Sequence, residues 1–180
     1  MIGEKPQGPT KLEIDLGDNL RLEELTTADA AEIIELVKDD PEGMRSFGES
    51  AAKLFSSTES LVESMENETR HHYLGLRVEG ALAVLLAYLT EPRQTVKLSY
   101  YTGKNFRKQG LAKRALSALT EEFFERKGIY HLIATVSESN LASIALLEST
   151  GFQKVSEFPD GSGEKFFRYD LEKPGHENDP

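Results

Sequence analysis

The chain has 180 residues, a formal net charge of −10 and no cysteine. This length is typical of one domain with a substantial core, and a hydrophobic content of 38% argues against a fully disordered chain. The acidic balance argues against nucleic acid as the main partner. Without cysteine, the chain cannot form disulfides, thiolate metal sites or a cysteinyl intermediate.

Neither a targeting segment nor a membrane segment is visible. Residues 1–11 lack the apolar run of a secretory signal. The longest apolar stretch, residues 81–89, is nine residues long, whereas a membrane-spanning helix needs about 20. We therefore expect a soluble cytoplasmic protein. Its polar, proline-containing ends, residues 1–11 and 173–180, are predicted to be flexible tails around a single domain at residues 12–172.

The first half of the chain is predicted to begin with a strand and then become helical. Apolar and polar residues alternate at residues 20–25, which predicts a strand. Thr26 or Thr27 can cap the helix that follows, and Pro41 ends it. Residues 41–55 and 58–67 make up a second helical region.

The centre of the chain has the pattern of a run of strands. Strands are predicted at residues 72–78 and 81–89, joined by a tight turn at Glu79 and Gly80. A third strand is predicted at residues 95–102, where alternate apolar residues share one face. These three strands are expected to form an antiparallel meander.

Five further elements complete the chain: a helix at residues 111–127, a strand at 130–136, a helix at 140–150, and a hairpin of strands at 152–158 and 165–171. The strand at 130–136 is mostly apolar, so we expect it to be buried on both faces. The element order predicts an α/β fold. Its mixed, mostly antiparallel sheet has about six to seven strands, a central β-α-β crossover, and helices on both faces.

Positive charge is concentrated in one part of this acidic chain. Residues 92–120 contain no Asp or Glu and seven basic residues, while the other 151 residues carry 14 basic and 31 acidic ones. Such a segment is either a chance fluctuation on a solvated face or a local site for an anion, such as a phosphate-bearing ligand.

The segment before the helix at residues 111–127 has the features of an anion site. Free N–H groups and the positive end of the helix dipole attract phosphate at a helix N-terminus. Gly110 has no side chain where a phosphate would approach, and Lys108, Lys113 and Arg114 add positive charge. The spacing fits neither a P-loop nor a dinucleotide-binding loop. An ordinary strand–helix turn that needs a glycine is the alternative.

Two motifs resemble those of the GNAT N-acetyltransferases. Residues 107–112, Arg-Lys-Gln-Gly-Leu-Ala, match the family's Arg/Gln-x-x-Gly-x-Gly/Ala signature. Residues 140–143 (Asn-Leu-Ala-Ser) and 147–152 (Leu-Glu-Ser-Thr-Gly-Phe) resemble its Asn-x-x-Ser/Ala and Gly-Phe segment. The element order also agrees, from about Leu20 to Leu171. The Asn-x-x-Ser form is most similar to the branch that acetylates protein N-termini, including the ribosomal-protein serine and alanine acetyltransferases.

The resemblance implies that acetyl-CoA is the co-substrate, and no metal is expected. Backbone amides of the turn would hold the pyrophosphate, and the preceding strand would pair with the pantetheine arm. The amide of Tyr101 would stabilise the oxyanion. Asn140 would bind the arm or only cap its helix. The residues implied in cofactor binding are Tyr100, Tyr101, Thr102, Arg107, Lys108, Gln109, Gly110, Leu111, Ala112, Lys113, Asn140 and Ser143.

The implied reaction is direct attack of a primary amine on the acetyl thioester in a ternary complex. Ser143 matches the serine proposed as the acid in the Asn-x-x-Ser branch, although a small residue in the first helical turns would look the same. Leu147 stands where several relatives have a tyrosine that acts as the acid, and Thr135 stands where some have a glutamate that acts as the base. The base is therefore unassigned among four weak candidates: Glu138, Glu157, Asp160 and Glu164.

We therefore predict an N-acetyltransferase whose acceptor is a protein N-terminus or a small cationic amine. It would act as a monomer or homodimer, with no nucleic acid and no membrane as partner. A catalytically silent acyl-CoA-binding module stays open because of Leu147 and Thr135, and so does a plain interaction domain. The pair His71 and His72 is interpreted as a polar strand edge, since no carboxylate spacing completes a metal site.

Overall fold

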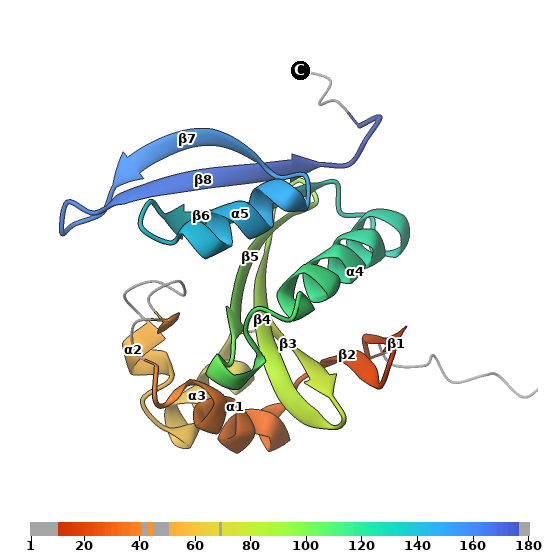
Figure 1. Cartoon of the computed structure of the whole chain (residues 1–180), viewed down its shortest axis with the longest axis vertical. Helices are drawn as coiled ribbons and strands as arrows, with labels where there is room; N and C mark the ends of the chain where they lie inside the picture. The colour runs from red at the N-terminus through yellow and green to blue at the C-terminus, as the bar shows by residue number, and fades with distance from the viewer. Residues whose placement is uncertain (1–10, 41–42, 45–50, 69, 177–180) are drawn as a thin grey trace, which may run out of the picture.

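The computed structural model describes residues 11–40, 43–44, 51–68 and 70–176, and these contain one eight-stranded sheet (Figure 1). The strand order is β1-β2-β3-β4-β5-β6-β8-β7, and only β5 and β6 pair in parallel. The strands are β1 Glu13–Gly17, β2 Leu20–Glu24, β3 His71–Val78, β4 Ala81–Glu91, β5 Thr95–Thr102, β6 His131–Ser137, β7 Gln153–Pro159 and β8 Lys165–Glu172.

Helices cover both faces of the sheet. They are α1 Ala30–Val37, α2 Ala51–Leu54, α3 Thr58–Asn67, α4 Leu111–Arg126 and α5 Leu141–Ser149, with short 3₁₀ turns η1 Thr27–Asp29 and η3 Lys104–Phe106. Among the residues just described, no helix is both long and apolar enough to cross a bilayer.

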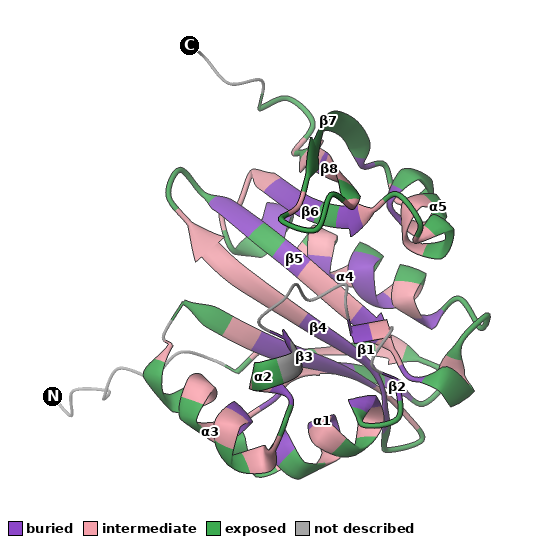
Figure 2. Cartoon of the chain, turned by 90° about the vertical axis from the view of Figure 1, so that its left-hand side faces the viewer, coloured by how far each residue is buried: buried purple, intermediate pink, exposed green. Residues whose placement is uncertain are grey.

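Two separate cores result from the alternation of side chains along the strands. The central strands of the sheet contain many of the buried residues (Figure 2). On one face, Val96 and Leu98 of β5 pack with Leu119 of α4. On the other, Tyr101 of β5 packs with Ile33 of α1. The central strand β5 therefore connects both helical layers, and any displacement of its end affects both.

The mixed α/β architecture, the mostly antiparallel sheet and the helices on both faces are confirmed. The sheet has slightly more strands than the six to seven expected, because β1 was not expected. Its side chains alternate between half-buried and exposed, and pairing with β2, such as Ile14 opposite Leu22, holds it at the sheet edge. A short polar edge strand gives little hydrophobic signal of its own.

The expectation that residues 130–136 are buried on both faces is wrong at one position, Thr135. Leu132, Ala134 and Val136 are buried, but Thr135 is exposed. The core that includes α1 and α3 contains no residue of β6 among those described. Thr135 therefore has no helical layer over it.

The predicted tails and the first helical region fall partly on residues that the structure does not describe. Residues 1–10 and 177–180 lie outside the described residues, as do 41–42 and 45–50 of the predicted 41–55 region. Near the C-terminus, the N–H of Lys173 donates to the Tyr130 carbonyl at 2.8 Å. The ring of His176 stacks on Tyr130 with centroids 3.9 Å apart. The limits of the domain stay a prediction.

The feature that positions the functional site is the separation of the two parallel strands. β5 and β6 pair only from Thr95 opposite His131 to Leu98 opposite Ala134. On its other side, β5 stays paired with β4 as far as Thr102 opposite Val84. The second half of β5 therefore has a partner on one edge, while its other edge turns toward the space between β5 and β6.

Candidate acetyl-CoA and acceptor site

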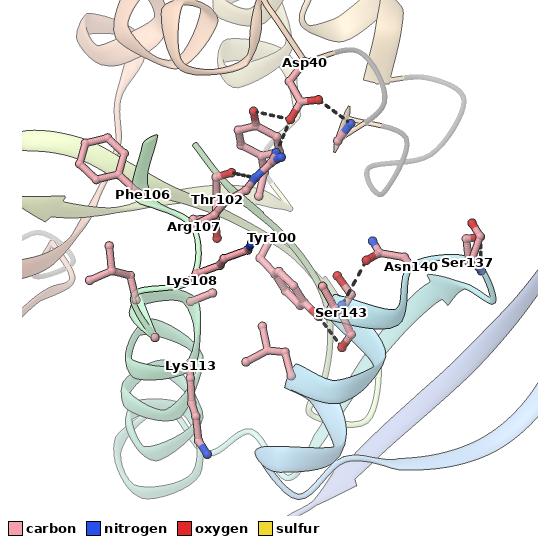
Figure 3. A pocket seen from close by; sticks show the side chains of 18 of the residues that line it. Asp40, Tyr100, Thr102, Phe106, Arg107, Lys108, Lys113, Ser137, Asn140 and Ser143 are labelled. Carbon is pink, nitrogen blue, oxygen red and sulfur yellow. Dashed lines mark hydrogen bonds and ion pairs between the residues drawn. The ribbon is translucent and has the colours of Figure 1, made fainter. Parts of the chain in front are cut away.

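A cavity of about 650 Å³ lies at this separation, beside the N-termini of α4 and α5 (Figure 3). All the predicted cofactor residues except Gln109 line it. The Gln109 side-chain amide instead donates to the Asn105 carbonyl at 3.2 Å. The structure thus brings together two motifs that are about 30 residues apart in the sequence.

The turn before α4 presents backbone N–H groups to this cavity. Gly110 is the N-cap of α4 and has a left-handed conformation, with φ 73° and ψ 5°. It has no side chain to cap the helix, and the first amides of a helix have no carbonyl partner within it. Lys108 also has a positive φ, of 61°. Such a turn is suited to an anion, which accepts from the free amides.

Three of the seven bases of the 92–120 segment line the cavity: Arg107, Lys108 and Lys113. Within the described residues, the side chains of Lys108 and Lys113 have no ion-pair partner. By contrast, Lys97 pairs with Glu91 at 2.9 Å, away from the cavity. Only part of the basic segment therefore lies at the cavity.

Arg107 is committed to a carboxylate that the sequence did not single out. Its guanidinium forms an ion pair with Asp40 and donates from Nε to the Thr102 carbonyl at 3.1 Å. Asp40 also accepts from the Tyr101 hydroxyl at 3.0 Å and from the Gly43 N–H at 3.1 Å. These contacts tie the segment after α1 to the end of β5.

Asp40 is only 7% exposed. Burial acts to raise the pKa of Asp40, but the Gly43 amide, Arg107 and Tyr101 outweigh it and hold the pKa below its usual value. Asp40 is therefore ionised at neutral pH, and both of its carboxylate oxygens accept hydrogen bonds. The only sequence signal for it was an acidic residue immediately before the helix-ending Pro41.

The two tyrosines of β5 point to opposite faces and serve as hydrogen-bond donors. Tyr100 donates to the Ser143 carbonyl at 3.3 Å and so links β5 to α5. Burial raises the pKa of Tyr100 to about 12. Burial and the neighbouring Asp40 raise the pKa of Tyr101 to about 12 as well. Both hydroxyls stay protonated at neutral pH, so neither can accept a proton from an amine.

Asn140 and Ser143 occupy the start of α5. The Asn140 side chain accepts from the Ser143 N–H at 3.1 Å, so it caps the helix. Ser143 lines both the main cavity and a hollow of about 10 Å³ where β5 and β6 separate. Thr135 lines this hollow too, whereas Leu147 is 1% exposed and belongs to the core.

The opposite end of the cavity carries hydroxyl groups and one carboxylate. Glu164 directly precedes β8 in the β7–β8 hairpin and accepts a hydrogen bond from the Ser137 hydroxyl. Ser137 and Ser139 are joined by a hydrogen bond of 2.8 Å between their hydroxyl oxygens. Of the four candidate bases, Glu138, Glu157 and Asp160 do not line the cavity, and Glu164 does.

No group of three or more His, Asp or Glu residues in the described part of the chain could hold a metal ion. His72 stacks on Tyr88 with ring centroids 4.6 Å apart, which fits the interpretation as a polar strand edge.

A family model described as "Acetyltransferase (GNAT) domain" matches residues 19–153, which is most of the chain. The chain belongs to the GNAT acetyltransferase family. The resemblance of the two motifs is thereby confirmed. Comparison with curated proteins finds no match for this GNAT chain.

Solved structures of GNAT acetyltransferases share the fold. The ribosomal-protein-S5-alanine acetyltransferase from Vibrio fischeri superposes with a TM-score of 0.78 at 13% identity, covering 93% of this chain and 100% of that one. The ribosomal-protein-alanine N-acetyltransferase from Brucella melitensis gives 0.70 at 25%, covering 84% and 99%. RimJ from Mycobacterium smegmatis, in complex with CoA-disulfide, gives 0.73 at 16%, covering 90% and 86%.

Proposed function

We propose that this protein transfers an acetyl group from acetyl-CoA to a primary amine, and that its acceptor is the α-amino group of a protein N-terminus. The observation that carries this proposal is the separation of β5 and β6 next to the Gly110 turn. The separation leaves one backbone edge of β5 available to the pantetheine arm. The anion site of the Gly110 turn lies at the end of that edge. Two structural neighbours, both ribosomal-protein alanine acetyltransferases, support the choice of acceptor.

The residues of the cavity fit acetyl-CoA. The amides at the start of α4, with Lys108 and Lys113, would bind its pyrophosphate, and residues 100–102 would pair with its pantetheine arm. Acetyl-CoA supplies an activated acetyl group, so the chain needs only to orient the amine and manage charge. The Tyr101 amide would face the oxyanion, and the Ser143 hydroxyl would donate to the leaving sulfur.

A catalytically silent acyl-CoA-binding module is the second candidate. It is favoured by Leu147 and Thr135, which remove two proton-transfer side chains that relatives use. Ser143 and the carboxylate at the far end of the cavity argue for retained chemistry, because each offers a titratable or polar group near the required position.

The deciding experiment is a thiol-release assay with acetyl-CoA and a panel of amines. The panel would contain peptides with free N-terminal Ser or Ala, the same peptides with blocked N-termini, and spermidine. We expect CoA release and a 42 Da mass increase, about one acetyl group, only with free N-terminal peptides. CoA release with spermidine alone would show that the acceptor is a small cationic amine and not a protein N-terminus. Binding of acetyl-CoA without CoA release would support the silent module.

A further inference from the structure

The cavity has a closed end where β5 and β6 begin to separate. The last pair between these strands is Leu98 opposite Ala134. At about 3.3 Å per residue, the edge of β5 from Thr102 back to Leu98 is about 13 Å long. The Gly110 turn follows Thr102 in the chain. A pantetheine arm that starts at this turn and runs along the edge therefore passes Thr102 first and ends beside Tyr100.

Tyr100 closes this end of the cavity from the side of α5 (Figure 3). Its half-buried ring packs against the core that contains Leu98. Its hydroxyl donates to the Ser143 carbonyl at 3.3 Å. Because burial raises the pKa of Tyr100 to about 12, the hydroxyl stays a donor at neutral pH. The side chain is therefore fixed at its base by β5 and at its tip by α5.

A second, smaller hollow adjoins the cavity at Tyr100. Its volume is about 10 Å³, and its wall includes the buried apolar residues Leu98, Ala134 and Val136. Within the described residues, only Tyr100 and Ser143 line both the hollow and the main cavity. A volume of about 10 Å³ is close to the least that holds one water molecule. The hollow therefore has no room for a carbon chain while the Tyr100 ring is in place.

We propose that the Tyr100 ring limits the acyl group of the cofactor to acetyl, so that Tyr100 determines the preference for acetyl-CoA over longer acyl-CoA thioesters. This inference rests on the proposed function, which supplies the cofactor. Each added methylene group would have to displace the ring and break its hydrogen bond to Ser143. Protein interiors are close-packed, so a ring that is held at both ends does not yield to an added carbon without cost. A shorter side chain would join the apolar hollow to the cavity and admit the longer chain.

The other aromatic residues near the cavity lie in different places. Tyr101 points to the opposite face of the sheet, where it packs in the core that contains Ile33 and donates to Asp40 at 3.0 Å. Phe106 follows the end of β5, on the way to the Gly110 turn. Tyr100 is therefore the aromatic side chain at the closed end of the cavity.

The test is Tyr100→Leu, which keeps an apolar side chain but removes the hydroxyl and the outer part of the ring. In the wild type, we expect kcat/KM with an N-terminal Ser peptide to be about 10-fold higher for acetyl-CoA than for propionyl-CoA, and about 100-fold higher than for butyryl-CoA. In Tyr100→Leu, both ratios should fall at least about fivefold. Ratios that are the same in both proteins would overturn the assignment.

A binding measurement separates this inference from the proposed function. Titration calorimetry without any amine gives the Kd for CoA, acetyl-CoA and butyryl-CoA. We expect the wild type to bind butyryl-CoA about 10-fold more weakly than acetyl-CoA. Tyr100→Leu should bind the two thioesters equally, with the Kd for CoA unchanged. Absence of turnover on every amine would overturn the proposed function, whereas an equal ratio of Kd values in both proteins would overturn the acyl limit.

Two variants distinguish the ring of Tyr100 from other effects. Tyr100→Phe keeps the ring and should hold both kinetic ratios within about threefold of the wild type. A change as large as that of Tyr100→Leu would overturn the ring as the barrier. Tyr88→Leu is the matched control, because half-buried Tyr88 packs against the same core, edge-on to Phe123 at 5.0 Å, and does not line the cavity. A similar loss of selectivity in Tyr88→Leu would show general loosening of the core and overturn the assignment.

A further variant keeps the inference testable if Tyr100→Leu does not fold. Tyr100→Met introduces a long, flexible side chain that fills irregular space in cores. Because this side chain can move aside, we expect both kinetic ratios to fall, though by less than in Tyr100→Leu. Circular dichroism checks the fold of each variant, and wild-type ratios in a folded Tyr100→Met would overturn the proposal.

Discussion

The two ends of the cavity are built in opposite ways. The proposed cofactor end consists of neighbouring residues, from Lys108 to Lys113, and presents mainly backbone amides. The proposed acceptor end combines side chains from segments far apart in the sequence: Ser137 at the end of β6 and Glu164 directly before β8. A backbone-built site depends on local conformation, whereas a side-chain-built site depends on the packing of the whole sheet.

The largest expected effect tests the backbone-built end. Gly110→Asp places bulk and negative charge beside the proposed pyrophosphate site. We expect the Kd for acetyl-CoA to rise at least about 100-fold, or about 2.7 kcal/mol, measured by titration calorimetry. A Cβ at Gly110 would meet nothing within 4 Å, so the protein should still fold despite its left-handed φ of 73°.

Gly110→Asn is the matched control for this prediction. Asn and Asp have nearly the same size and both tolerate the left-handed region. The difference in Kd between the two variants therefore reports the added charge alone. Equal affinities for Gly110→Asp and the wild type would contradict the assignment of the turn to a phosphate.

The next effect concerns the link between the two ends. Asp40→Asn removes the charge that holds Arg107 and leaves a buried amide that cannot accept from all three present donors. We expect the free energy of unfolding to fall by about 2 kcal/mol, measured by urea denaturation at pH 7. Asp39→Asn, at the neighbouring exposed position, is the control and should have almost no effect. Similar stabilities for both variants would show that the Asp40 cluster is not structural.

A smaller effect is expected at Ser143, which lies between the two ends. If its hydroxyl donates a proton to the leaving thiolate, Ser143→Ala should lower kcat about tenfold, with KM less affected. The cap of α5 uses the backbone N–H of Ser143, so alanine preserves it. Ser149→Ala at the exposed end of α5 is the control. An unchanged kcat in Ser143→Ala would show that Ser143 has no catalytic role and is only a small residue in the first turn of α5.

The same contrast explains how far the sequence alone could predict this protein. The Gly110 turn and the cap at Asn140 were predictable because each is a local pattern with a local cause. Strand β1 was missed because its position depends on pairing with β2 rather than on its own apolar content.

The contacts between distant segments were the least predictable part of the site. Asp40 meets Arg107 across 67 residues, and Ser137 meets Glu164 across 27. No spacing rule connects such pairs, since the register of the sheet brings them together. Glu164 was one of four weak candidates, and only its place in the cavity distinguishes it.

The smallest effect is expected at a carboxylate that belongs to neither end. Asp170 on β8 accepts from Arg168 through two bonds of 2.7 Å and lies 2.7 Å from His131 Nε2. Burial acts to raise the pKa of Asp170, but Arg168 and His131 outweigh it and keep it below its usual value. Because the folded pKa is the lower one, the stabilisation is complete above the unfolded pKa, about 3.9, and disappears as pH falls through the folded pKa.

Asp170→Asn should therefore cost about 1 kcal/mol of unfolding free energy at pH 7, and the difference from the wild type should shrink steadily as the pH falls below about 4. Urea denaturation at a series of pH values measures this. Asp18→Asn, which affects an exposed pair with Arg114, is the control and should change stability less. Acetyl-CoA affinity should be unchanged in Asp170→Asn, because Asp170 does not line the cavity. A loss of affinity would mean that the pairing of β6 with β8 affects both ends of the site. The proposed cofactor end would then depend on the packing of the sheet as well as on the local conformation of its turn.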